Sequence, residues 1–93
     1  MVTITESARK ALKNILDAEE TQPGQSLRLV EEQGKHRLTV GIEQEGDQVV
    51  EHKGETVLLI GPDIGSQLES FVLDLWDTPE GSRLAITPKK EDN

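Results

Sequence analysis

The feature that most constrains this chain is a change in the spacing of its apolar residues near residue 24. Before that point apolar residues recur at helical spacing, and after it apolar and polar residues alternate, as in 27–29 and 38–42. A helical period places apolar side chains along one stripe of a helix, and a period of two places them on one face of a sheet. The sequence therefore predicts one amphipathic helix beside strands that each bury one face. The apolar residues at helical spacing are Ala8, Ala11, Leu12, Ile15 and Leu16.

The expected helix has a start and an end signal. Thr5 is a good N-cap because its hydroxyl can accept a hydrogen bond from a free backbone N–H of the first turn, and Glu6 follows at the positive end of the helix dipole. The apolar pattern weakens over residues 19–22. Pro23 disfavours helical geometry at the residue before it and Gly24 permits a reversal, so this pair is expected to end the helix.

Four strands are expected to follow the helix, separated by turns that contain glycine. They cover residues 25–30, 37–43, 48–52 and 56–60. The first two are expected to be antiparallel, and the third to turn back beside the second near Gly46, which makes a meander. The fourth strand is a continuous apolar run, which predicts burial on both of its faces.

The second half of the chain predicts a short helix and a terminal hairpin. Asp63 is expected to cap the helix, with Ile64, Leu68 and Phe71 facing inward. The hairpin strands are expected over 72–77 and 82–87, joined by a turn at 78–81.

The predicted fold class is a small β-rich α+β domain with one long N-terminal helix, a short second helix and about six to seven mostly antiparallel strands. We expect a single domain over residues 1–87 and a charged flexible tail over 88–93.

Charge and composition exclude several classes of function. The net charge is −8, and a surface of that sign repels nucleic acid. The absence of cysteine removes disulfides, thiolate nucleophiles and cysteine-ligated metals. No apolar run approaches the roughly 18 residues that span a bilayer, and the N-terminus has no signal-peptide core. We therefore expect a cytoplasmic protein that binds neither nucleic acid nor membrane.

The order of several short motifs resembles a known family. In one register, nearly the whole chain is similar to the HesB/IscA-type family, the A-type carriers of iron–sulfur cluster assembly. The resemblance implies a compact β-rich domain with one long helix, usually a dimer or tetramer in the cytoplasm. The matching residues are Ile4-Thr5-Glu6-Ser7-Ala8, Leu27-Arg28-Leu29, a glycine turn before Leu38, Gly46-Asp47, Val57-Leu58, Leu68, Val72-x-Asp74, and Gly81 before a last strand that closes at Pro88.

The same resemblance shows what this sequence lacks. The family's metal chemistry depends on three cysteines, one in a Gly-Gly-Cys-Ser-Gly turn before the second strand and two in a Cys-Gly-Cys-Gly segment near the C-terminus. Here the turn reads Gln33-Gly34-Lys35-His36-Arg37, so Lys35 stands at the first thiolate position. By the family's usual spacing, the sequence ends at Asn93 just before the next cysteine is due.

Ligand chemistry sets the functional expectation. Iron–sulfur clusters are held by thiolates, and the ammonium of Lys35 repels a metal cation. We expect no cofactor and no catalysis, and a role in iron–sulfur cluster biogenesis through protein contact. The expected partners are assembly components, with a homo-oligomer as a further expectation.

Two alternatives stay open. The first is metal, in particular iron, held by the two imidazoles of the chain, His36 and His52, with Glu51 or Glu43. Strand pairing about Gly46 would place His52 opposite residue 41 and His36 several residues further along, so two exposed polar histidines are the favoured interpretation. The second alternative is an unrecognised enzyme, although no serine has the context of an activated nucleophile and no two acids are placed in a desolvated pocket.

Trp76 is the remaining candidate for an interaction site. On a strand it faces opposite to Leu73 and Leu75, so it either packs under the long helix or lies on an outer face. The core position is the favoured interpretation. On an outer face Trp76 would anchor a partner, since tryptophan is enriched at interface hot spots.

Overall fold

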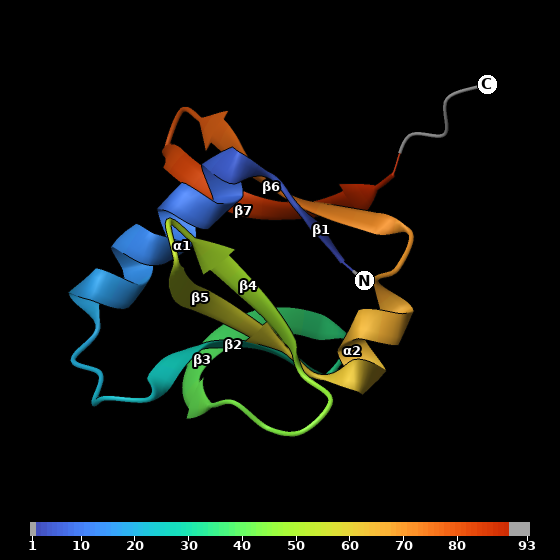
Figure 1. The fold of residues 1–93 in the computed structure, drawn as a ribbon. Helices are drawn as coiled ribbons and strands as arrows, with labels where there is room; N and C mark the ends of the chain where they lie inside the picture. The colour runs from blue at the N-terminus through green and yellow to red at the C-terminus, as the bar shows by residue number, and fades with distance from the viewer. Residues whose placement is uncertain (1, 90–93) are drawn as a thin grey trace.

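The computed structural model describes residues 2–89, which form two helices and seven strands (Figure 1). The strands make two sheets, one in the order β1-β6-β7 and one in the order β3-β2-β5-β4. Helix α1 contacts strands of both sheets, and the core lies between them. This is the α+β domain that the sequence predicts. The elements are β1 (Thr3–Ile4), α1 (Glu6–Ala18), β2 (Gln25–Glu32), β3 (Lys35–Ile42), β4 (Gln48–His52), β5 (Glu55–Ile60), α2 (Pro62–Gln67), β6 (Phe71–Thr78) and β7 (Gly81–Pro88).

Helix α1 begins at the predicted cap. The Thr5 hydroxyl accepts a hydrogen bond from the Ala8 N–H at 3.2 Å and donates one to the Asp74 carboxylate of β6 at 2.7 Å. The cap therefore also ties the start of the helix to the three-stranded sheet. The buried side chains of the apolar stripe are Ala8, Leu12 and Leu16.

The helix ends earlier than expected. It stops at Ala18, where the Glu19 N–H donates to the carbonyls of Ile15 and Leu16. The expected end at Pro23-Gly24 is wrong, because the apolar stripe stops at Leu16 and further turns would bury nothing against the sheets.

The order of the four-stranded sheet overturns the expected meander. β2 pairs antiparallel with β3 and parallel with β5, and β4 pairs with the other side of β5. β3 and β4 therefore lie at opposite edges of the sheet although they are consecutive in sequence. The physical reason is the apolar run 57–60 of β5, which is buried at every position, as predicted. A strand with two apolar faces is stable inside a sheet and not at its edge.

The loop between β3 and β4 has to cross one face of this sheet. Ile42, the last residue of β3, lies opposite Gln25 at the start of β2. Gln48, the first residue of β4, lies opposite Ile60 at the end of β5. The chain therefore passes diagonally over β2 and β5 within residues 43–47 (Figure 1).

An ion pair holds this crossing loop on the sheet. Arg28 of β2 donates two hydrogen bonds to the Asp47 carboxylate, at 2.6 and 2.9 Å, and the Asp47 side chain is 0% exposed. Asp47 also accepts a hydrogen bond from the Gln44 N–H at 2.7 Å, within the same loop. The hydrogen bonds from Arg28 lower the pKa of the Asp47 carboxyl below its ordinary value.

The three-stranded sheet combines the N-terminal segment with the predicted C-terminal hairpin. β6 and β7 are antiparallel, and β1 adds parallel to β6 through two residue pairs, which is too short a strand to predict from sequence. The Gln48 side-chain amide accepts from the Val2 N–H at 2.8 Å and donates to the Val2 carbonyl at 2.9 Å. This side chain joins β4 to the N-terminal segment and so connects the two sheets.

Helix α2 forms where predicted but with a different cap. Gly61 is the N-cap and Pro62 the first helical residue, and no side chain caps the helix, so the expected Asp63 cap is wrong. Leu68 is buried, and Ile64 and Phe71 pack against the core as expected. Within residues 2–89, neither helix is long and apolar enough to cross a membrane.

The end of β7 lies at the start of the expected tail. The strand continues to Pro88, and the Lys89 N–H donates to the Ser70 carbonyl at 2.7 Å. The remaining residues of that tail, 90–93, lie outside the described residues.

Replacing Asp47 with asparagine is expected to lower the free energy of unfolding by about 3 kcal/mol, because Arg28 is left without its countercharge in a largely buried position. The pKa of Asp47 is lower in the folded protein than in the unfolded chain. Its stabilisation is therefore present above the unfolded pKa and lost as the pH falls below about 4, through the folded pKa. Urea unfolding followed by circular dichroism, from neutral to acidic pH, should show the two proteins converging at low pH.

Asp17→Asn is the matched control, since Asp17 pairs with Lys13 at the surface. Its effect on the free energy of unfolding should be smaller. An Asp47→Asn protein as stable as the wild type at neutral pH would show that other contacts hold the crossing loop.

Candidate functional site

The turn that carries Lys35 is shorter than expected. Gln33 and Gly34 have φ angles of 52° and 78°, so they form a two-residue hairpin turn with both central residues in the left-handed region. Lys35 is the first residue of β3 and lies opposite Glu32, and both side chains are exposed. The position that resembles a thiolate site therefore holds a solvated ammonium at the start of a strand.

The two histidines do not come together. His36 lies on β3 with its Nε2 3.7 Å from the Glu31 carboxylate, and His52 ends β4 at the opposite edge of the sheet. The expected alignment of His52 with residue 41 is wrong, because β3 and β4 do not pair. Both imidazoles are partly buried and not fully exposed.

The acidic side chains also fail to converge. Among residues 2–89, no group of three or more His, Asp or Glu side chains is placed to hold a metal ion. An iron–sulfur cluster fits the described residues poorly, since the sequence has no thiolate and its imidazoles are separated.

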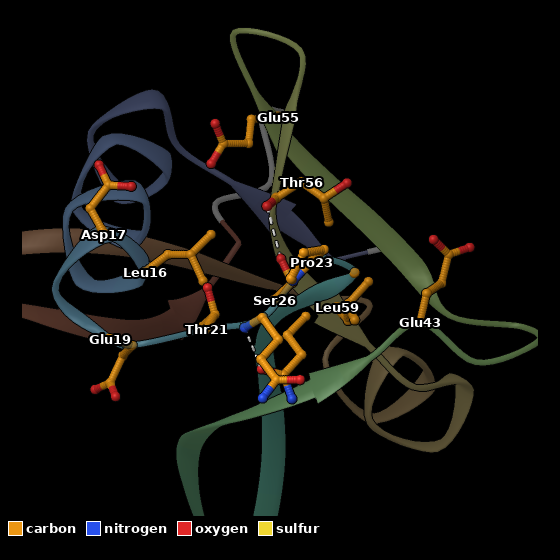
Figure 2. Close-up of a pocket in the computed structure, with 13 residues that line it drawn as sticks. Leu16, Asp17, Glu19, Thr21, Pro23, Ser26, Glu43, Glu55, Thr56 and Leu59 are labelled. Carbon is orange, nitrogen blue, oxygen red and sulfur yellow. Dashed lines mark hydrogen bonds between the residues drawn. The ribbon is translucent and has the colours of Figure 1, made fainter.

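A polar pocket of about 510 Å³ lies between the end of α1, the loop that follows it and strands β2 and β5 (Figure 2). Asp17 and Glu55 on its rim are both bound by Lys13 of α1, at 2.6 and 2.9 Å. Figure 2 shows Glu19 and Glu43 on opposite sides of the pocket. These carboxylates are paired or dispersed, so the pocket offers no pair of acids whose pKa values a shared site would separate.

The buried hydroxyl of the pocket, that of Ser26, has a hydrogen-bond acceptor. Ser26 is buried and donates its hydroxyl hydrogen bond to the Thr56 carbonyl at 2.8 Å, as the dashed line in Figure 2 shows. The Ser26 hydroxyl proton is directed at a backbone carbonyl, which is too weak a base to activate a nucleophile.

A second groove, of about 610 Å³, runs between α1 and the β6–β7 hairpin. Its lining is largely apolar and includes Lys10 of α1. Arg83 of β7 borders the groove, but by register its side chain shares the outer face of the hairpin with Trp76. In the part of the chain that the structure describes, neither cation belongs to an ion pair. The apolar residues that line it are Ala11, Ile15, Leu75 and Leu84.

One feature of the sequence indicates this groove. Ala11 and Ile15 belong to the apolar stripe of α1 but lie on its flank, and they are only partly buried where the core residues of the stripe are fully buried. The contribution of Leu84 and Arg83 could not be predicted, because it depends on how the hairpin packs against the helix.

Trp76 lies on the other face of the same hairpin. Its side chain is 50% exposed, so the favoured core position is wrong. Leu73 is buried and Leu75 lines the groove beside α1. The alternation of the strand turns Trp76 away from both, onto the outer face, where Arg83 is its cross-strand neighbour.

Comparison with known proteins identifies solved structures with a similar fold. No family model matches the sequence, and no curated protein matches it. Solved structures do match. The crystal structure of Escherichia coli SufA, described as involved in biosynthesis of iron–sulfur clusters, is similar with a TM-score of 0.70 and 20% identity, over 94% of this chain and 84% of that chain. A crystal structure of IscA with the 2Fe–2S cluster is similar with a TM-score of 0.58 and 18% identity, over 95% of this chain and 85% of that chain.

The domain therefore has the HesB/IscA-type fold, as the sequence motifs predict. At this level of identity the likeness concerns the fold. It confirms the expected architecture, and the chemistry of the site has to be argued from the residues that this chain places in it.

Anaerobic incubation with iron and sulfide is expected to leave the protein without the visible absorbance of a cluster, because no thiolate is present to bind one. Metal analysis after desalting should find less than one iron per chain. His36→Ala should leave that value unchanged, with His52→Ala as the matched control. One tightly held iron per chain that is lost in His36→Ala alone would overturn this expectation and establish a site on β3.

Proposed function

We propose that this protein acts in iron–sulfur cluster biogenesis as a non-catalytic accessory that contacts assembly proteins and holds no cluster itself. The observation that carries the proposal is the fold of SufA and IscA over most of the chain, combined with the absence of cysteine and a lysine at the first ligand position. A scaffold without its ligands can still present the surfaces that its partners bind. The proposed setting is the cytoplasm.

The groove between α1 and the β6–β7 hairpin is the proposed contact surface. Its apolar lining suits a segment with apolar side chains, and Lys10 suits an acidic side chain beside them. Arg83 offers a second cation on the adjoining outer face of the hairpin. The chain as a whole carries a charge of −8, so two neighbouring cations that form no ion pair with any described residue are a local exception. The proposed partner is therefore an assembly protein that presents an acidic and apolar segment.

Charge reversal in the groove and beside it tests this surface. Lys10→Glu and Arg83→Glu, each alone, should weaken binding to a captured assembly protein about tenfold, a loss of about 1.4 kcal/mol. Lys89→Glu, the same change of charge at the other end of β7, should leave the affinity unchanged. Affinity capture from the source cell identifies the partner, and titration calorimetry with the purified partner measures each variant.

The two ways to fail are distinct. Capture that returns no cluster-assembly component would remove the proposed pathway. Equal affinity of all three variants for a captured assembly protein would keep the pathway and remove the groove as the contact.

Trp76 is proposed as a second anchor at the hairpin. It is the one tryptophan of the sequence, so its fluorescence reports on this position alone. Binding of the partner should shift its emission to shorter wavelength, and Trp76→Ala should weaken binding about tenfold or more because half-exposed aromatic anchors dominate many interfaces. An unchanged emission spectrum in the complex would place the partner elsewhere.

A further inference from the structure

β3 is an open edge of the four-stranded sheet. It is the terminal strand in the order β3-β2-β5-β4, and its eight residues pair with β2 without a register shift. The strand contains no proline. β4, at the other edge, has five residues and a register shift between Val50 and Glu51. Natural edge strands are commonly short, bulged or interrupted by proline, and β3 has none of these protections.

The connections on either side of β3 leave this edge uncovered. The turn before the strand consists of two residues, Gln33 and Gly34. The loop after it leaves the edge and crosses β2 and β5, where the ion pair of Arg28 with Asp47 holds it over the sheet face. Neither connection therefore runs along the outer side of β3.

The hairpin turn decides which backbone groups of β3 face outward. A turn of two residues closes with hydrogen bonds between the residues on either side of it, here Glu32 and Lys35. Along an antiparallel pair of strands, bonded and non-bonded residue pairs alternate. The N–H and C=O groups of His36, Leu38 and Val40 therefore point away from β2.

These outward groups have no partner elsewhere in the described chain. Within residues 2–89, no turn, loop or side chain forms a hydrogen bond with the backbone of Leu38 or Val40. The Ile42 carbonyl differs, because it accepts a hydrogen bond from the Arg28 guanidinium at 3.5 Å. The row of free backbone groups thus ends at Val40.

Apolar side chains accompany the free backbone groups. By register, Leu38 and Val40 share a face with Leu29 and Leu27, which are buried. Leu38 packs against the core, whereas Val40 is 36% exposed and Ile42 is 59% exposed. A strand laid beside β3 would extend this apolar face with its own side chains and cover both exposed residues.

The opposite face of β3 is polar. By alternation Lys35, Arg37 and Thr39 lie on it. Arg37 lies 3.3 Å from the Glu32 carboxylate, whereas Lys35 forms no ion pair with any described residue. An acidic side chain directly across from Lys35 on a neighbouring strand would therefore be favourable.

We infer that β3 binds an extended segment of another protein, which adds to the sheet as a further strand antiparallel to β3. An extended chain fits because its alternate N–H and C=O groups have the spacing of the free groups of β3, and antiparallel pairing is the more stable per residue. The segment carries apolar side chains opposite Leu38, Val40 and Ile42 and an acidic one opposite Lys35. This surface is separate from the groove beside α1, so the inference goes beyond the proposed function.

A synthetic peptide tests the edge directly. The probe is Val-Thr-Val-Thr-Val-Ser-Thr-Glu with blocked ends, whose first residue is to lie opposite Ile42 and whose last is to lie opposite Lys35. In amide hydrogen exchange followed by NMR, the N–H groups of Leu38 and Val40 should exchange rapidly in the free protein and slowly in the complex. The N–H of Val49 on β4, at the other edge, should be unaffected.

Methylation of the peptide backbone separates strand addition from contact through side chains alone. In the antiparallel register the N–H groups of the third and fifth residues, both valine, point at Val40 and Leu38. N-methylation of either valine should weaken binding about tenfold, since one bond is lost and a buried acceptor is left unpaired. N-methylation of either of the first two threonines, whose N–H groups point away from β3, is the matched control and should leave the affinity unchanged.

A charge exchange tests the register. Lys35→Glu should weaken binding of the peptide about threefold, and a peptide that ends in lysine should restore it. Lys53→Glu is the matched control, because Lys53 is exposed in the turn between β4 and β5 at the other edge of the sheet. Circular dichroism checks that both variants are folded.

Four results would overturn the inference. They are a wild type that does not bind the peptide at millimolar concentration, protection of β4 in place of Leu38 and Val40, equal binding of the two kinds of methylated peptide, and tighter binding of the peptide with its sequence reversed. None of these results bears on the groove, whose variants Lys10→Glu and Arg83→Glu are measured with a captured assembly protein. Failure at the β3 edge and failure of the proposed function are therefore distinguishable.

Discussion

The pairing of Arg28 with Asp47 is the interaction on which the arrangement of this fold depends. β3 and β4 are neighbours in sequence but occupy opposite edges of a sheet, so residues 43–47 must cross two strands. Such a loop carries polar backbone over a sheet face and needs a fixed attachment. Arg28 of β2, the strand beneath the loop, supplies this attachment. With the loop held over the sheet face, β5 can lie between β2 and β4. By register Arg28 lies opposite Leu59, which is buried, so the pair sits where the crossing loop covers an apolar face.

The short-range features of this fold could be predicted from the sequence, and the long-range strand pairings could not. Helix α1 and the hairpins β2–β3 and β6–β7 are set by spacing, caps and turns within a short stretch, and the sequence predicts all three. The pairing of β5 with β2 joins residues about thirty apart through an unbroken apolar run, and the run predicts burial but names no neighbour. The expected core position of Trp76 is wrong for a related reason. Alternation along the strand predicts which side of the strand Trp76 faces, but only the packing of the rest of the chain decides which side is covered.

The core of the domain is built from apolar side chains. Its core contains thirteen buried apolar residues drawn from α1, both sheets and the segment after α2. Small metal-dependent domains unfold without their ion because ligand bonds replace such a core. Here the hairpin that carries Lys35 is held by strand pairing and by the left-handed turn at Gln33-Gly34, none of which involves a ligand. The described part of the domain therefore keeps its shape through strand pairing and the burial of apolar side chains.

The cations of the chain divide into two groups. Lys13, Arg28 and Arg37 each pair with a carboxylate of the chain, whereas Lys10 in the groove and Arg83 beside it form no ion pair among the described residues. The ion pairs within the chain therefore stabilise the fold, whereas the cations at and beside the groove stay exposed to solvent.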